Sequence, residues 1–238
     1  MISAPVKSAL PQELPQFDLL ESLLWEEGRG FYLLGHHVER LRDSAACLGF
    51  DFSTTGLDAA LAEFDGIARR GRHKVRVLLS RDGKLVVESA PATSISGGRV
   101  ALARRATLRN TSLLRHKTTY RKHYSDPLQD RQVDEPGIID VILWDDAGNI
   151  TEAGMANVIV KSRGDLYTPS LQQELLPGVF RRSLLEQGIV SEKQITLAEF
   201  HTADAVFLVN SVRGWMPLGP SGRQGVWVIE DDFRYEVP

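Results

Sequence analysis

The segment LLPGVFRRSLLEQG, residues 175–188, is the most informative part of the sequence. Pro177 and Gly178 precede a run of residues that favour a helix, and we expect that helix to end at a glycine. The first turn of a helix has backbone N–H groups without intrahelical partners, and the helix dipole favours an anion there. The amides of Val179 and Phe180 are therefore candidate phosphate ligands, although an ordinary helix started by proline has the same pattern.

The composition of the 238-residue chain is typical of a globular protein and disfavours several classes. The net charge of −3 gives no general reason to expect binding to nucleic acid or to a membrane. No run approaches 18 apolar residues, and residues 1–20 lack the apolar centre of a signal peptide. Cys47 is the only cysteine, so an internal disulfide is impossible and a cytoplasmic location is expected.

Residues 89–125 contain no acidic side chain but eight lysines and arginines, among them Lys117 and Arg121. This pattern fits either a solvated basic surface or a cleft that attracts an anionic ligand. A nucleic-acid site is a weaker alternative, because Tyr120 and Tyr124 are the only stacking groups in the stretch and the whole chain is slightly acidic.

The first hundred residues predict a small α+β unit, and the remainder predicts a larger one. The first unit is expected to contain hairpins over 17–34 and 73–89, helices over 37–48 and 57–70, and a strand over 99–103. The second is expected to contain strands over 138–144, 157–161, 165–167, 205–210 and 226–229, and helices over 177–187 and 197–201.

The expected boundary between the units gives an N-terminal domain of residues 1–104, a linker of residues 105–110 and a C-terminal domain of residues 111–238. We find no internal repeat and no low-complexity tract. A cleft between two such units is a common place for a ligand site.

Further positions along the chain complete the chemistry that a phosphorylated aldehyde cofactor needs. Lys117 lies among cations that disfavour its protonated form and so favour attack on an aldehyde. Glu152 follows a predicted turn and is a candidate partner for a ring nitrogen. Arg40 is a candidate phosphate ligand, and the hydroxyl and free N–H groups of the turn at Ser211 and Val212 are expected to complete the phosphate site. Together these groups match what pyridoxal 5′-phosphate (PLP) requires, although each one alone is equally explained as a surface residue.

The order and spacing of these positions resemble the class IV aminotransferase family, the fold-type IV PLP enzymes, over residues 17–218. The segments that carry the resemblance are HHVERLRDSAACLGF (36–50), HKTTYR (116–121), GNITEAGMANVIV (148–160), LLPGVFRRSLLEQG (175–188) and ADAVFLVNSVRGWMPL (203–218). Within the family, the sequence is most similar to the 4-amino-4-deoxychorismate lyases. The resemblance implies a small N-terminal α+β domain, a larger C-terminal domain with a β-barrel-like sheet, and a homodimer.

The resemblance also implies roles for individual residues. Lys117 matches the lysine that holds PLP as a Schiff base, and Glu152 matches the acid at the pyridine nitrogen. The phosphate would be held by Arg40, Gly178, Val179, Phe180, Ser211 and Val212. Arg76 and Arg121 match positions that contact substrate in some members, and Asn157 matches a polar position near the cofactor. No metal site is expected.

The reaction implied is conversion of 4-amino-4-deoxychorismate to 4-aminobenzoate and pyruvate in folate biosynthesis, in cooperation with aminodeoxychorismate synthase. Lys122 stands where the aminotransferases usually have a tyrosine, which favours the lyase. The proline-rich segment before Phe17 departs from the family pattern. The alternatives are an aminotransferase acting on D-amino or branched-chain acids, a binding or regulatory protein without PLP, and a nucleic-acid binder with a basic cleft.

Overall fold

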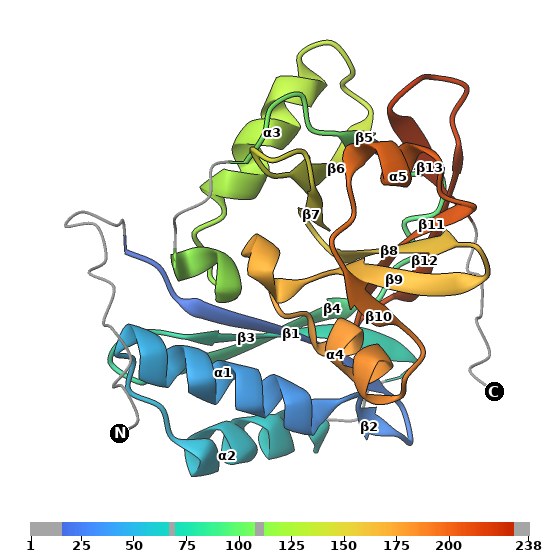
Figure 1. Cartoon of the computed structure of the whole chain (residues 1–238). Coiled ribbons are helices and arrows are strands. Elements are labelled where there is room, and N and C mark those ends of the chain that lie inside the picture. Colours follow the sequence, from blue (N-terminus) through green and yellow to red (C-terminus); the bar gives the residue numbers. More distant parts are fainter. Residues whose placement is uncertain (1–15, 67–69, 108–111, 231–238) are drawn as a thin grey trace.

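The computed structural model describes residues 16–66, 70–107 and 112–230, which form two β-sheets with five α-helices around them (Figure 1). The first unit comprises β1 (Leu19–Glu26), β2 (Gly30–Phe31), α1 (Leu34–Leu48), α2 (Thr54–Asp65), β3 (Arg72–Leu79) and β4 (Leu85–Pro91). Its four strands are antiparallel, in the order β2-β1-β3-β4.

The second unit holds the remaining elements. Its strands are β5 (Arg99–Leu102), β6 (Ile138–Trp144), β7 (Ile150–Ala153), β8 (Asn157–Ser162), β9 (Asp165–Pro169), β10 (Ser191–Lys193), β11 (Ala205–Asn210), β12 (Gly214–Pro220) and β13 (Val226–Ile229). Its helices are α3 (Lys122–Gln132), α4 (Val179–Glu186), α5 (Leu197–His201) and the short 3₁₀ turns η1 (Ser112–Arg115) and η2 (Leu171–Gln173).

Alternation along β3 gives the smaller sheet two different faces. Val75, Val77 and Leu79 are buried and belong to the same core as the apolar residues of α1 and α2, which cover this face (Figure 1). Successive side chains on a strand point to opposite faces. Lys74 and Arg76 therefore lie on the other face, which is turned toward the larger sheet.

Seven strands of the larger sheet close into a barrel in the order β8-β11-β12-β13-β5-β6-β7. The closure is the pairing of β7 with β8, where Glu152 and Asn157 are register partners. β9 and β10 extend the sheet beyond β8. A buried apolar cluster that includes Ile142, Val158 and Leu208 forms the core of this unit. The barrel-like sheet beside a small α+β layer confirms the fold predicted from the sequence.

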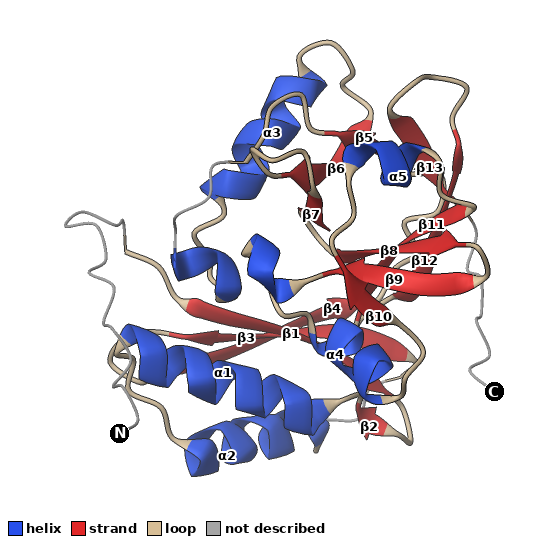
Figure 2. Ribbon diagram, viewed as in Figure 1, coloured by secondary structure: helices blue, strands red, loops and turns tan. Residues whose placement is uncertain are grey.

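The helices of the larger unit lie at the outside of its sheet (Figure 2). α4 packs through Phe180 and Leu184 against β8, β11 and β12, which fixes the position of its N-terminus. α3 contacts β6 and buries Tyr124. α5 begins with a capping box between Thr196 and Glu199, as expected for a short helix that needs its first turn stabilised.

Six elements were not predicted: α3, β7, β10, β12 and the 3₁₀ turns η1 and η2. α3 is largely polar, buries only Tyr124 and contains Pro127, so it lacks the apolar period that indicates a helix. β7 is only four residues long and follows directly after the predicted turn, so no separate strand was expected there. The Gly148 turn before it was expected, and its φ of 78° shows why glycine is needed there. The helix predicted over 57–70 ends at Asp65, and residues 67–69 lie outside the described residues.

One predicted assignment was wrong. The strand at Arg99–Leu102 was placed in the N-terminal unit, but it pairs with β6 and β13 of the barrel. The barrel needs this strand to join β13 to β6, a long-range pairing that local periodicity does not reveal. The chain thus passes from one sheet to the other between β4 and β5. We propose a domain division there; of the predicted linker 105–110, residues 108–110 lie outside the described part.

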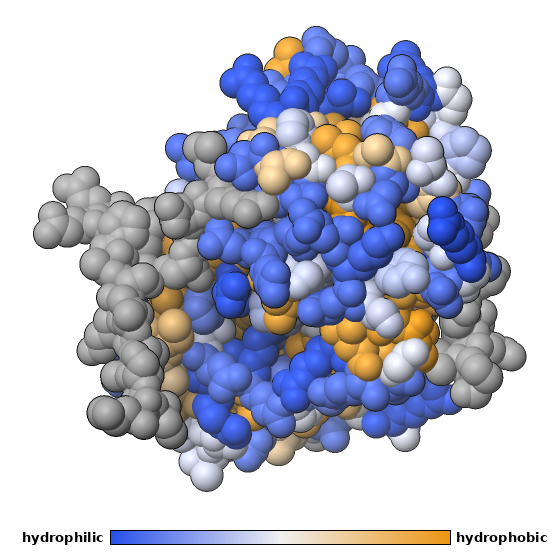
Figure 3. Space-filling model, viewed as in Figure 1, coloured by the Kyte–Doolittle hydropathy of each residue, from blue (hydrophilic) through white to orange (hydrophobic). Residues whose placement is uncertain are grey.

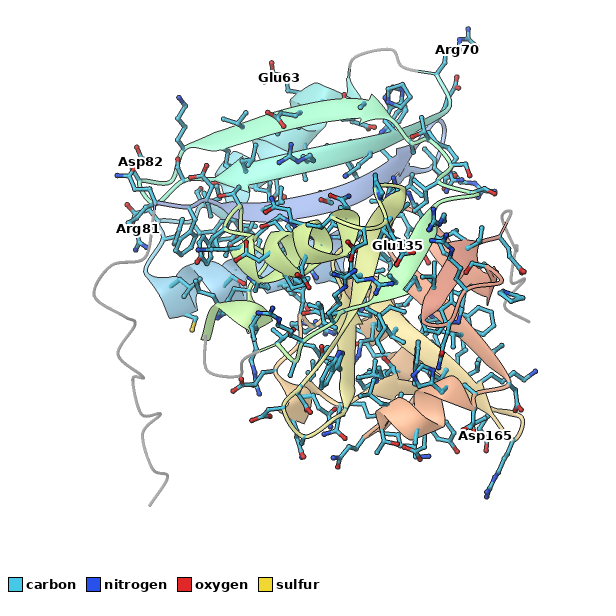
Figure 4. All side chains as sticks on the ribbon, turned by 90° about the horizontal axis from the view of Figure 1, so that it is seen from above. Glu63, Arg70, Arg81, Asp82, Glu135 and Asp165 are labelled. Carbon is cyan, nitrogen blue, oxygen red and sulfur yellow. The ribbon has the colours of Figure 1, made fainter. Side chains whose placement is uncertain are left out.

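The visible surface in Figure 3 is mostly hydrophilic, with small hydrophobic areas between the charged side chains. Charged residues such as Arg70, Asp82 and Asp165 extend outward at the edges of the molecule (Figure 4). Glu135 instead joins three arginines, because it accepts hydrogen bonds from Arg99, Arg131 and Arg223. Within residues 16–66, 70–107 and 112–230, no helix is long and apolar enough to cross a membrane.

Candidate active site

A cavity of about 310 Å³ lies between the two units and gathers every site residue predicted from the sequence. The smaller sheet and its helix α1 form one wall, and the open end of the barrel with the start of α4 forms the other. The predicted residues that line the cavity are Arg40, Arg76, Lys117, Arg121, Glu152, Asn157, Gly178, Val179, Phe180, Ser211 and Val212.

Lys117 reaches the cavity from a segment that pairs with the start of β1. The amide of Leu20 donates to the Lys117 carbonyl at 2.9 Å, and the Thr119 amide donates to the carbonyl of Asp18 at 2.9 Å. These bonds fix the backbone on both sides of the lysine. Burial lowers the pKa of Lys117 to about 7, and the cations of Arg40 and Arg121 contribute in the same direction. A large fraction of this amine is therefore neutral, and hence nucleophilic, at neutral pH.

Glu152 lies on β7, buried at the opposite wall. Its Oε1 accepts hydrogen bonds from the Tyr124 hydroxyl at 2.9 Å and from the Leu176 amide at 3.2 Å. Among the described residues, Oε2 accepts no hydrogen bond, so it remains available to a ligand. Burial raises the pKa of Glu152 to about 7, although the bond from Tyr124 opposes this shift. A cationic partner in the cavity would restore the ionised form.

Arg40 is held in place from behind by a buried carboxylate. Its Nε and Nη2 donate to the two oxygens of Glu21 at 2.8 and 2.6 Å, and its Nη1 donates to the carbonyl of Pro177 at 3.1 Å. Glu21 is also 2.7 Å from Nδ1 of His37. Burial alone would raise the pKa of Glu21, but the charges and hydrogen bonds of Arg40 and His37 lower it to about 2.

The start of α4 is shaped by Asn157. The Asn157 amide donates to the Leu176 carbonyl at 2.9 Å. Its oxygen lies so close to Gly178 that a Cβ added at that glycine would be 1.7 Å away. Gly178 is the N-cap of α4 and supplies no side-chain cap, so the first amides of the helix face the cavity without a competing side chain.

The turn between β11 and β12 forms the end of the cavity next to the smaller sheet. The Ser211 hydroxyl donates to the Ser22 carbonyl at 3.3 Å, which links this turn to β1. The expectation of free amides in the turn is wrong for Val212, because its N–H donates to Oδ1 of Asn210 at 3.0 Å. Asn210 also donates to the Met155 carbonyl at 3.2 Å, so it fixes the turn against the β7–β8 loop.

Four cationic side chains surround the rest of the cavity or lie next to it. Arg121 lies over the ring of Tyr124, 4.4 Å from its centre, and donates to the Gly154 carbonyl. Arg76 pairs with Glu88 at 3.0 Å. Lys74 lines the cavity, and Arg213 lies beside it.

The donor set of the cavity fits PLP. It offers a nucleophilic amine, a buried carboxylate with one free oxygen, an arginine and the uncapped start of a helix. Lys117 and Glu152 would hold the aldehyde carbon and the ring nitrogen, and Arg40 with the amides of Val179 and Phe180 would hold the phosphate. Within the described residues, no group of three or more potential metal ligands is present.

Sequence reasoning missed several residues that build this site. Tyr124 and Asn210 act through hydrogen bonds to Glu152 and to the turn, and no local pattern marks either of them. Glu21 lies in the hairpin predicted over 17–34, but only its register with β3 and its contact with α1 reveal that it faces Arg40. Asp140 fixes the β7–β8 loop by accepting a bond from the Met155 amide at 3.0 Å, and burial raises its pKa to about 6.

Comparison with known proteins defines the class. Residues 18–219 match the family described as amino-transferase class IV, and the chain belongs to this family. A crystal structure from Mesorhizobium loti, provisionally assigned as an amino-acid aminotransferase, is 32% identical with a TM-score of 0.76. That match covers 84% of this chain and 98% of the other.

The relatives are named after two different activities. A Schizosaccharomyces pombe protein, provisionally named an aminodeoxychorismate lyase, is 27% identical over 208 residues, which is 84% of this chain and 88% of that protein. The branched-chain-amino-acid aminotransferase-like protein 1 of Arabidopsis thaliana is 24% identical, and the match covers 88% of this chain but 44% of that protein. The 4-amino-4-deoxychorismate lyase of Pseudomonas aeruginosa shares the fold, with 21% identity and a TM-score of 0.68 over 89% of this chain and 88% of the other.

Proposed function

We propose that the chain is a PLP-dependent lyase that converts 4-amino-4-deoxychorismate to 4-aminobenzoate and pyruvate. One observation carries the proposal: a buried lysine and a buried carboxylate face the same cavity, whose remaining charged side chains are almost all cationic. The first two groups suit PLP, and the excess of cations suits a substrate with two carboxylates. The lyase relative from Schizosaccharomyces pombe, matched over most of both chains, supports this reaction.

Glu152, Arg40, the start of α4 and Lys117 each have a part in the proposed reaction. When bound, PLP withdraws electrons from the carbon that carries the substrate amine and so makes its proton acidic. Glu152 sustains this effect by keeping the ring nitrogen protonated through Oε2. Arg40 and the start of α4 orient the ring by holding the phosphate. Lys117, once released by the substrate amine, is the base that removes the proton.

Aromatisation drives the second half of the reaction. Loss of that proton supplies the electron pair that completes the aromatic ring while the C–O bond to the enolpyruvyl group breaks. The enolpyruvate leaves with the bonding electrons and takes up a proton to give pyruvate. Lys117 has a pKa of about 7, so it can accept a proton and return it within one turnover at neutral pH.

The direct test uses the purified protein with PLP and enzymatically prepared aminodeoxychorismate. We expect 4-aminobenzoate and pyruvate in equal amounts without any amino acceptor. Lys117→Ala should lose both products, and Lys84→Ala, an exposed lysine on the β3–β4 turn, should keep them. Full activity of Lys117→Ala would contradict the mechanism.

The second candidate function is an aminotransferase acting on D-amino or branched-chain acids, which the similarity to the Arabidopsis thaliana protein favours. One observation disfavours this alternative. Position 122, where the aminotransferases usually have a tyrosine, is an exposed lysine at the start of α3. Transfer of an amino group to 2-oxoglutarate, without release of 4-aminobenzoate from aminodeoxychorismate, would establish the aminotransferase instead.

We also propose an oligomeric state, a location and a partner enzyme for this protein. A homodimer, a cytoplasmic location and cooperation with aminodeoxychorismate synthase, which makes the substrate, follow from the resemblance to the lyases. Sedimentation of the holoenzyme at twice the mass of the chain would support the homodimer. Sedimentation at the mass of a single chain would contradict it.

A further inference from the structure

The face of the smaller sheet that borders the cavity carries a lysine without a counter-ion. Lys74 lies on β3, two residues before Arg76, and both side chains line the cavity. Arg76 is paired with Glu88, whereas the side chain of Lys74 has no hydrogen bond or ion pair with any of the described residues. Lysines that are partly buried without a partner are costly, because burial disfavours the ammonium form.

The surroundings of Lys74 increase this cost. Burial lowers the pKa of Lys74, and the cations of Arg213, Arg76 and Arg121 lower it further. Arg213 comes from the β11–β12 turn, and its Nε is buried without a hydrogen-bond partner within the described part of the chain. Cations from three separate segments of the chain thus lie close to Lys74, and few carboxylates of the protein neutralise them.

The positive charge that PLP would leave unpaired indicates which kind of ligand group binds on the β3 side of the cavity. Arg40 and the start of α4 would bind the phosphate of PLP, Lys117 would bind its aldehyde, and Glu152 would bind its ring nitrogen. None of these residues belongs to β3. The cations left over in the cavity wall are Lys74, Arg76 and Arg121. Glu88 pairs with Arg76, and the two other cations are still more than a single carboxylate would neutralise.

We propose that Lys74 is a specificity-determining residue that binds the second carboxylate of a substrate amine carrying two carboxylates, while Arg76 and Arg121 bind the first. Side chains two residues apart on a strand are about 7 Å apart along it, so Lys74 and Arg76 present their charges to different groups of the ligand. A substrate with one carboxylate leaves Lys74 unpaired. The choice of aminodeoxychorismate as the natural ligand rests on the proposed function, but the preference for dicarboxylates does not.

The preference can be measured with ligands that do not react. We would titrate the PLP-loaded enzyme with benzoate and with benzene-1,3-dicarboxylate by calorimetry. The wild type should bind the dicarboxylate about tenfold more tightly, as expected for one additional charge-assisted contact. Lys74→Met should lose this difference and keep its affinity for benzoate. Lys84→Met, which removes an exposed lysine from the same hairpin, should behave as the wild type.

Two results would overturn the inference. One is a wild type without preference for the dicarboxylate, and the other is a preference that survives in Lys74→Met. The visible absorbance of bound PLP must be retained in the variant, and Lys74→Gln is the second variant if it is not. Loss of bound PLP in both variants would also overturn the inference, because Lys74 would then support the cofactor site rather than contact substrate.

A parallel assay with aminodeoxychorismate separates this inference from the proposed function. Lys74→Met should raise KM about tenfold and change kcat much less. If no 4-aminobenzoate forms but the dicarboxylate preference depends on Lys74, the proposed lyase is wrong and the inference holds. If 4-aminobenzoate forms with an unchanged KM in Lys74→Met, the lyase holds and the inference is wrong.

Discussion

Glu152 and Asn157 are the register partners at which β7 pairs with β8 and the barrel closes. Both residues also line the cavity, where Glu152 offers a carboxylate oxygen and Asn157 fixes the start of α4. The closure of the barrel therefore places the candidate ring-nitrogen partner beside the candidate phosphate site. This pairing makes the site rigid, as a preorganised cofactor site requires.

The first prediction concerns the hydrogen bond from Tyr124 to Glu152. Tyr124→Phe removes a bond that lowers the pKa of Glu152, so the carboxyl group becomes protonated at a higher pH and stabilises a cationic ring nitrogen less. A hydrogen bond to a charged group contributes about 1.5–3 kcal/mol, so we expect at least about tenfold weaker PLP binding. Titration of the apoprotein by absorbance measures it, and unchanged affinity would contradict this role.

The second prediction concerns the close approach of Gly178 and Asn157. Gly178→Ala would put a Cβ 1.7 Å from the Asn157 oxygen, so the start of α4 or the asparagine must shift. We expect a loss of about 1–3 kcal/mol in the free energy of unfolding and a larger loss of PLP affinity. Gly35→Ala is the matched control, because a Cβ there meets no atom within 4 Å. Adding Asn157→Ala to Gly178→Ala should recover part of the stability.

The third prediction is a pH-dependent loss of stability. The pKa of Glu21 is lowered to about 2 in the folded chain, so its stabilising effect is complete above about pH 4.5 and disappears as the pH falls toward 2. Glu21→Gln should therefore lower the free energy of unfolding by about 3 kcal/mol at neutral pH. The difference from wild type should shrink below about pH 4.5.

Urea unfolding across this pH range measures the effect. Glu63→Gln is the control, since Glu63 is exposed at the outer edge of α2 (Figure 4). An equal loss of stability at every pH would show that the charge of Glu21 is not responsible.

The fourth prediction concerns the reactivity of Lys117. Only the neutral amine attacks an aldehyde, and the pKa of Lys117 is about 7 rather than 10.5. The rate at which the apoprotein takes up PLP should therefore rise with pH and level off above about pH 8. A rate that continues to rise toward pH 10.5, as expected for an exposed lysine, would contradict the proposed environment.

The candidate site residues could be predicted from the sequence because each lies in a short segment that resembles the class IV aminotransferase family. Pro177 and Gly178 mark a helix start, and the turn before Glu152 is marked by Gly148. These are local signals: α4 begins where Pro177 and Gly178 predicted a helix start, and the expected turn at Gly148 precedes β7. Local signals of this kind also predicted most of the helices and strands in both units.

The remaining features depend on contacts between distant segments. The assignment of Arg99–Leu102 to the wrong unit shows this, because its partners β6 and β13 lie far away in sequence. Tyr124 was considered only as a stacking group, since nothing near it in sequence indicates a bond to Glu152. The Val212 amide was expected to be free. In the folded turn it donates to the side chain of Asn210, a contact that the sequence alone does not show.

The central claim is that PLP is joined to Lys117, and borohydride reduction followed by peptide mass spectrometry tests it most directly. Reduction of the PLP-loaded protein fixes the cofactor to whichever amine carries it. We predict a single modified peptide with the adduct on Lys117, and none in Lys117→Arg. An adduct on Lys74, the other lysine that lines the cavity, or no adduct at all, would contradict the account.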